Sequence, residues 1–170
     1  MAETEKQLDK KKGASKGFRI VALAIILVVV ITVLIAVIVS GQPTQQFRLS
    51  AEYYGTSEML TGLTKDEYEQ LLAQKKSFVV MVDKPGCITT PPMRERMANF
   101  PANMQFKYYQ FMWSEARESS LHGYVTFVPS VAIIREGKVV AWLRADSDED
   151  VDYFNSAEAL QGWIAKYIAF

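Results

Sequence analysis

"VVMVDKPGCITTPPMRERM", residues 79–97, joins an apolar run to a predicted helix and contains the only cysteine of the chain, Cys87. The run at 77–83 is short and almost continuously apolar, which is typical of a strand that is buried on both faces. A helix is predicted after Cys87, with Pro91 or Pro92 in its first turn, because proline lacks the N–H that an interior turn requires. A single thiol therefore stands at a strand-to-helix junction.

The residue counts exclude several kinds of site. One cysteine excludes an internal disulfide and a Cys-rich zinc site, and one histidine argues against Cys/His metal clusters. The acidic run at 146–152 lacks the Gly and Glu of a calcium-binding EF-hand loop, where it has Val151 and Ala157 instead. We therefore predict a solvated loop there, and neither a metal nor a cofactor for the chain.

The charge is divided unevenly along the chain. Residues 1–19 contain six basic and three acidic residues, whereas the remainder has a net charge of about −3 because the whole chain is neutral. An acidic remainder argues against nucleic acid as the main partner.

The N-terminal part predicts a membrane anchor. Residues 20–39 contain one polar residue, Thr32, and no charge, and about 20 residues at 1.5 Å each cross the hydrocarbon core as a helix. Basic residues precede this segment, and Arg48 alone follows it closely, so the positive-inside rule leaves the N-terminus in the cytoplasm. We predict a cytoplasmic basic tail at 1–17, a transmembrane helix at 18–40, a linker at 41–57 and an extracytoplasmic domain at 58–170, which makes the chain a single-pass protein of the cell membrane.

The patterns in 58–170 alternate between helix and strand. Thr64 and Glu67 form the capping box of a first helix, and strands are predicted at 77–83 and 104–113. A short helix at 115–124, a hairpin at 128–146 with REGK as its turn, and a C-terminal amphipathic helix capped by Ser156 complete the order. Buried strands covered by helices on both faces predict an α/β sandwich.

Two separated landmarks in this domain resemble the thioredoxin-like superfamily. One is "FVVMVDKPGCITT", in which Cys87 stands where thioredoxins begin a C-x-x-C motif; the other is "GYVTFVPSVAIIREGKVVAWLRA", in which Val128-Pro129-Ser130 falls at the cis-proline of the family. The resemblance implies a three-layer thioredoxin-like sandwich with Cys87 and Thr90 as catalytic residues. It also implies a polypeptide-binding surface at Gly86, Ile88, Val128 and Pro129.

The chain departs from the family pattern at three positions. Thr90 replaces the second, resolving cysteine, Gly86 stands where many thioredoxins have tryptophan, and Met81 stands where they have a buried acid. The attacking thiol is kept, and we expect the helix start and the Thr90 hydroxyl to favour its thiolate. Release of a bound substrate then requires an external thiol or a second thiol on the substrate.

Two functions follow from this pattern. The first is monothiol disulfide exchange or isomerisation through Cys87, on a polypeptide substrate outside the membrane. The second is a redox-inactive accessory or binding module that assists an exported polypeptide or a membrane complex, because thioredoxin folds are reused with degenerate sites. The layout is loosely similar to that of bacterial thioredoxin-like proteins described as bacteriocin-transport accessory proteins.

Overall fold

The structure is a computed structural model that describes Val21, Leu27 and residues 45–170. The predicted tail at 1–17 and almost all of the predicted span at 18–40 lie outside the described residues. Val21 and Leu27 are helical, with 58% and 61% of their surfaces exposed. Within the described part of the chain, no helix has both the length and the apolar character that crossing a bilayer requires.

A mixed five-stranded sheet organises residues 45–170. Its order is β1-β3-β2-β4-β5, in which β3 pairs in parallel with β1 and β2, whereas β4 pairs antiparallel with β2 and β5. The strands are β1 (Met59–Leu63), β2 (Phe78–Asp83), β3 (Tyr108–Met112), β4 (Ser130–Arg135) and β5 (Lys138–Trp142). All six residues of β2 are buried, as its apolar sequence predicted.

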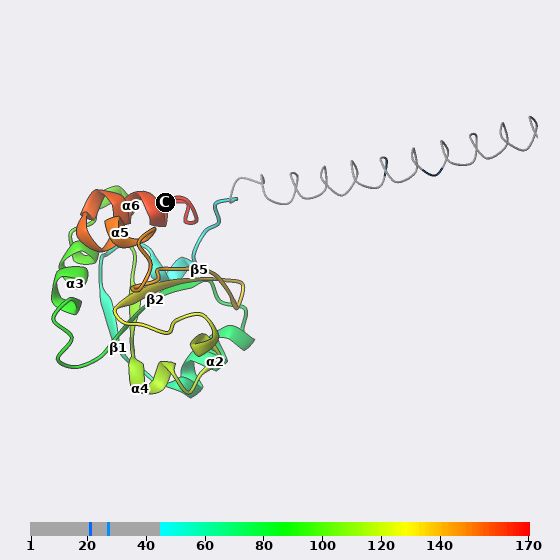
Figure 1. The fold of residues 1–170 in the computed structure, drawn as a ribbon, viewed down its shortest axis with the longest axis horizontal. Helices are drawn as coiled ribbons and strands as arrows, with labels where there is room; N and C mark the ends of the chain where they lie inside the picture. The colour runs from blue at the N-terminus through cyan, green and yellow to red at the C-terminus, as the bar shows by residue number, and fades with distance from the viewer. Residues whose placement is uncertain (1–20, 22–26, 28–44) are drawn as a thin grey trace, which may run out of the picture. The chain divides into compact units, whose positions relative to one another are not determined.

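Helices cover both faces of this sheet. In Figure 1, α3, α5 and α6 lie on one side of the sheet, and α2 and α4 lie on the other. The helices are α2 (Lys65–Ala73), α3 (Thr90–Ala98), α4 (Trp113–Ala116), α5 (Val151–Asn155) and α6 (Ala157–Ala165), with 3-10 turns η1 (Ala51–Tyr53), η2 (Ala102–Met104) and η3 (Ser120–Gly123). The arrangement is a mixed α/β sandwich with helices on both faces of the sheet, as the sequence predicted.

The predicted helix caps and the predicted hairpin are confirmed. Thr64 and Glu67 form the reciprocal capping box of α2, and the Ser156 hydroxyl accepts from the Ala159 N–H at the start of α6. In the β4–β5 turn, Glu136 and Gly137 have φ values of 49° and 75°, which is the left-handed pair of a tight hairpin turn.

Several elements differ from the predicted ones. The strand β1 was not predicted, because Gly62 and a shift of register between Leu60 and Leu63 remove the regular alternation. The predicted strand at 104–113 begins only at Tyr108, and the predicted helix at 115–124 is divided into α4 and η3. The acidic loop ends in the short helix α5. Local sequence does not fix these boundaries, which depend on pairing with β3 and on packing.

The segment 45–57, predicted as part of a linker, packs onto the domain. The exposed fractions of Leu49 and Tyr53 are only 4% and 3%. The Phe47 N–H donates to the Tyr167 carbonyl at 2.8 Å, and the Ala169 N–H donates to the Phe47 carbonyl at 2.8 Å. The compact unit therefore begins at Thr44, ahead of the expected boundary at residue 58, because these apolar side chains bury more surface than a solvated linker does.

Candidate functional site

Cys87 lies in the turn that connects β2 to α3. Its N–H donates to the Lys84 carbonyl at 3.3 Å, and its carbonyl accepts from the Thr90 N–H at 3.2 Å. Gly86, with φ of 76°, takes the left-handed conformation that this turn requires. The helix begins at Thr90, with Pro91 in its first turn, so the thiol precedes the helix by three residues.

Two neighbours contact the sulfur. The Thr89 hydroxyl lies 3.1 Å from Sγ. The Val128 carbonyl, which belongs to a segment distant in sequence, lies 3.8 Å from Sγ. The Val128–Pro129 bond is cis, as the resemblance implied. Folding therefore brings together Cys87 and the Val128-Pro129 segment, which the sequence places 41 residues apart.

The pKa of the Cys87 thiol is lowered from its ordinary value. The largest cause is the hydrogen bond with the Thr89 hydroxyl, and partial burial of the sulfur opposes it. The Thr90 hydroxyl and the backbone N–H groups of Thr89 and Thr90 lower the pKa less. A thiolate accepts hydrogen bonds, so these donors favour the reactive form.

The threonine whose hydroxyl contacts the sulfur is not the one that the sequence analysis predicted. Thr90 was expected to hold the thiolate, but its side chain is buried, and its hydroxyl forms no hydrogen bond of normal geometry in the described part of the chain. Thr89, to which the sequence analysis gave no role, supplies the main donor. Both residues follow the cysteine closely, and only the conformation of the turn decides which hydroxyl faces the sulfur.

A groove of about 490 Å³ lies beside the thiol. Its walls come from the start of α3, the Val128-Pro129 segment and the segment from residue 145 to α5. Of the predicted binding residues, Ile88, Val128 and Pro129 line the groove, whereas Gly86 shapes the turn and does not line it. Ile88 is 88% exposed, which makes it the most accessible apolar side chain at the site.

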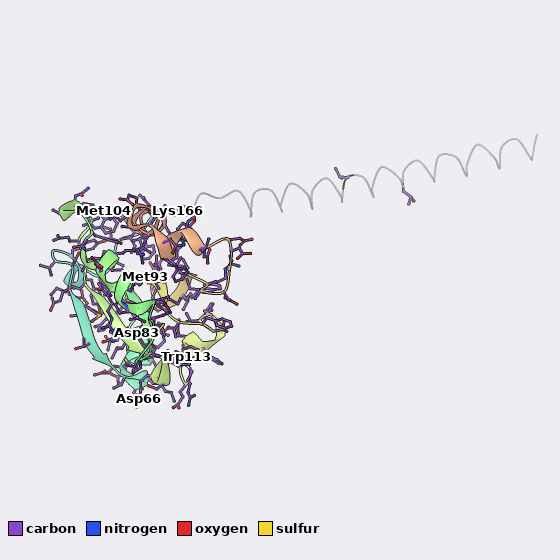
Figure 2. All side chains as sticks on the ribbon, turned by 60° about the vertical axis from the view of Figure 1, so that its left-hand side comes forward. Asp66, Asp83, Met93, Met104, Trp113 and Lys166 are labelled. Atoms are coloured by element: carbon purple, nitrogen blue, oxygen red, sulfur yellow. The ribbon has the colours of Figure 1, made fainter. Side chains whose placement is uncertain are left out.

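A buried carboxylate lies close to the site in sequence. Asp83, the last residue of β2, is 1% exposed and accepts hydrogen bonds from Arg94 Nε at 3.2 Å and from Gln110 Nε2 at 3.1 Å. Figure 2 marks Asp83 in the interior of the domain and Asp66 at its margin. Met81, where the family has an acid, is fully buried among apolar side chains. Asp83 thus connects the end of β2 to α3 and β3 through hydrogen bonds, a structural role that the apolar strand pattern did not predict.

No metal site accompanies this arrangement. Within residues 45–170, together with Val21 and Leu27, no three His, Cys, Asp or Glu side chains are grouped so as to hold a metal ion. The chemistry that these residues offer is that of one thiol with hydroxyl and backbone donors.

Comparison with known proteins gives solved structures only. No family model and no curated protein matches the chain. The solved structures include a mutant thioredoxin from Halobacterium salinarum (15% identity, 69% of this chain and 96% of that one, TM-score 0.45). They also include a protein called Trxlp from Edwardsiella tarda (13%, 63% and 98%, TM-score 0.46) and a thioredoxin from Malassezia sympodialis (14%, 66% and 95%, TM-score 0.46). The identities are below 25% and the TM-scores below 0.5 in all three.

Replacing Thr89 tests the main donor to the sulfur. Because valine cannot donate a hydrogen bond, we expect Thr89→Val to raise the pKa of Cys87 by about one unit, since a hydrogen bond to a charged group contributes about 1.5 kcal/mol or more. The pH dependence of Cys87 alkylation by iodoacetamide measures this pKa. Thr90→Val is the matched control and should raise the pKa less. An equal or larger rise in Thr90→Val would contradict the assignment to Thr89.

Removing Arg94 tests the buried carboxylate. We expect Arg94→Met to lower the free energy of unfolding by about 2 kcal/mol, less than the roughly 3–5 kcal/mol of a fully buried pair, because water reaches Arg94. Arg96→Met is the matched control on the same helix, has no ion pair in the described structure, and should cost less than about 0.5 kcal/mol. Urea unfolding measures both variants, and equal losses would show that Asp83 does not depend on Arg94.

Proposed function

We propose that the chain is a membrane-tethered, extracytoplasmic thioredoxin-like protein that performs monothiol disulfide exchange or isomerisation through Cys87. The observation that carries the proposal is the contact of the sulfur of Cys87, a partly buried residue, with the Thr89 hydroxyl at 3.1 Å, beside a groove of about 490 Å³. A donor that favours the thiolate, together with access for a substrate, meets the two requirements of disulfide exchange.

The proposed cycle begins with attack on a substrate disulfide. The Cys87 thiolate bonds to one substrate sulfur, and the other substrate sulfur leaves as a thiolate and takes a proton from water. A second thiolate, on the same polypeptide or on a small external thiol, then attacks the mixed disulfide and releases the Cys87 thiolate. When the second thiolate belongs to the substrate, one disulfide is broken and one is formed, so no net oxidation or reduction occurs.

The threonine at position 90 supports isomerisation or thiol-dependent release, and not net donation of a disulfide. A resolving cysteine three residues after Cys87 would release the enzyme by closing an internal disulfide, but the chain has a buried threonine there. Since the chain has a single cysteine, it cannot carry an internal disulfide to donate to a substrate. Isomerisation and thiol-dependent release are the remaining routes.

Apolar side chains around the site support a polypeptide as the substrate. Ile88, Phe127 and Val151 are 88%, 54% and 47% exposed, and Ile88 and Val151 line the groove itself. Exposed apolar side chains grouped at a groove favour binding of an unfolded or extended polypeptide, which has apolar side chains to bury.

These same side chains favour a second candidate, a redox-inactive accessory module. In that function the groove and its apolar rim bind an exported polypeptide or a membrane complex, and Cys87 fills space in the turn. The two functions differ in their need for the sulfur: disulfide exchange requires the Cys87 sulfur, whereas binding by the accessory module does not.

An exchange assay separates them. With a polypeptide that contains mispaired disulfides and a small thiol as co-reactant, we expect the wild-type chain to accelerate reshuffling and Cys87→Ser to abolish the acceleration. Thr89→Val should slow the reaction near neutral pH, because less thiolate is present when the pKa is higher. Equal rates with wild type and Cys87→Ser, with binding of the reduced polypeptide retained in both, would support the accessory module and exclude exchange.

A fusion assay tests the proposed location. The apolar segment 20–39 and the basic residues before it are the basis for the tether. In a bacterial host we expect alkaline phosphatase to be active when it is fused after Phe170 and inactive when it is fused before Phe18, because the enzyme requires an oxidising compartment. The reverse pattern would place the domain in the cytoplasm.

A further inference from the structure

Five basic residues belong to the chain segments that meet at the end of the sheet where β2 begins. This basic edge consists of Arg48, Lys75, Lys76, Arg135 and Lys138. Backbone contacts hold its segments together: the Ser50 N–H donates to the Ser77 carbonyl at 2.9 Å, and the Gly137 N–H donates to the Lys76 carbonyl at 2.9 Å. The acids within 45–52, 75–77 and 135–138 are Glu52 and Glu136, so the edge has a net positive charge.

The basic edge is opposite in sign to the domain that carries it. Residues 45–170 contain 13 Lys and Arg against 16 Asp and Glu. Five of these 13 cations lie on the one edge, which leaves the remaining surface strongly acidic. A positively charged patch on a negatively charged domain orients the domain in an external electric field.

Aromatic rings accompany the cations. The Arg48 guanidinium lies 5.2 Å from the centre of the Tyr54 ring, and the Arg135 guanidinium lies 5.4 Å from the centre of the Phe47 ring. Arg135 Nη1 also donates to the Gln45 carbonyl at 3.5 Å, at the first residue of the described domain. Arginine beside tyrosine and phenylalanine is a combination that suits the headgroup layer of a bilayer.

The basic edge and the thiol lie at opposite ends of the central strand. Arg135 follows Ile134, which pairs with Phe78 at the start of β2, whereas Cys87 follows Asp83 at the end of β2. Six residues at about 3.3 Å each separate the two ends by roughly 17–20 Å.

We propose that the basic edge rests on the anionic headgroups of the bilayer and so directs the Cys87 groove away from the membrane. The inference rests on the tether of the proposed function. The predicted span ends at residue 40, and the five steps to Gln45 cover at most about 17 Å. That reach keeps Gln45, and the Arg135 side chain that donates to its carbonyl, within about two Debye lengths of the surface, where anionic lipids attract Lys and Arg.

The structure provides two labelling positions for a test. Cys87 is the only cysteine and marks the far end, whereas Gln74→Cys in a Cys87→Ser background places a neutral, exposed label beside Lys75. The full chain is reconstituted into vesicles of phosphatidylcholine, with or without phosphatidylglycerol, that contain headgroup spin-labelled lipid. A membrane-impermeant fluorescent maleimide then reports quenching from outward-facing domains. We expect stronger quenching at position 74 than at position 87 in the anionic vesicles, and a fall of about half or more on raising the salt to about 0.5 M.

A matched pair of variants isolates the basic edge. Arg48→Gln/Lys75→Gln/Lys138→Gln should bring quenching at position 74 down to its value in phosphatidylcholine alone. The control Lys65→Gln/Lys84→Gln/Arg117→Gln removes the same charge away from the edge and should leave the quenching unchanged. Equal quenching at positions 74 and 87, or equal effects of the two triple variants, overturns the inference while the tether stands. A chain that alkaline carbonate extracts from the vesicles overturns the tether, and this inference with it, but leaves thiol exchange to its own assay.

Discussion

Burial of β2 on both faces is the constraint on which the rest of the domain depends. Its six residues are fully or almost fully removed from water, so both faces of the sheet require a covering layer of helices. The last of the six residues is Asp83, a carboxylate that cannot remain buried without partners. Arg94 of α3 and Gln110 of β3 supply them, and the same contacts fix how α3 lies against the end of the strand.

The position of the thiol follows from these hydrogen bonds of Asp83 with Arg94 and Gln110. The chain must turn between Asp83 and α3, and Cys87 lies within that turn, with its carbonyl bonded to the first N–H of the helix. The helix begins three residues later, so the nearest donor to the sulfur is the Thr89 hydroxyl and not the helix end. The largest cause that lowers the pKa of Cys87 is therefore one side chain of the turn, Thr89, opposed by partial burial and assisted by Thr90 and the backbone N–H groups. The local contacts therefore affect the pKa of the thiol more than the dipole of α3 does.

The two proposals use opposite ends of the same strand. The groove and its apolar rim lie beyond the end of β2, and the basic edge lies at its beginning. In the proposed orientation, the charge at one end holds the domain to lipid, and the apolar side chains at the other end meet a polypeptide outside the membrane. Segment 45–57 belongs to this domain, because the backbone of Phe47 is hydrogen-bonded to Tyr167 and Ala169 near the C-terminus.

The sequence by itself determined the elements whose patterns are strong and local. The apolar run of β2, the capping box at Thr64, the tight turn at Glu136-Gly137 and the cap at Ser156 were predictable because each depends on residues a few positions apart. Tertiary structure alone decided the pairing of β1, the packing of 45–57, the partners of Asp83 and the choice of Thr89 over Thr90. Each of these depends on contacts between distant segments, or on the conformation that such contacts impose on a turn. The Cys87–Val128 contact shows the division: the resemblance to a known family indicated both partners, but only the fold brings the sulfur to 3.8 Å from the carbonyl.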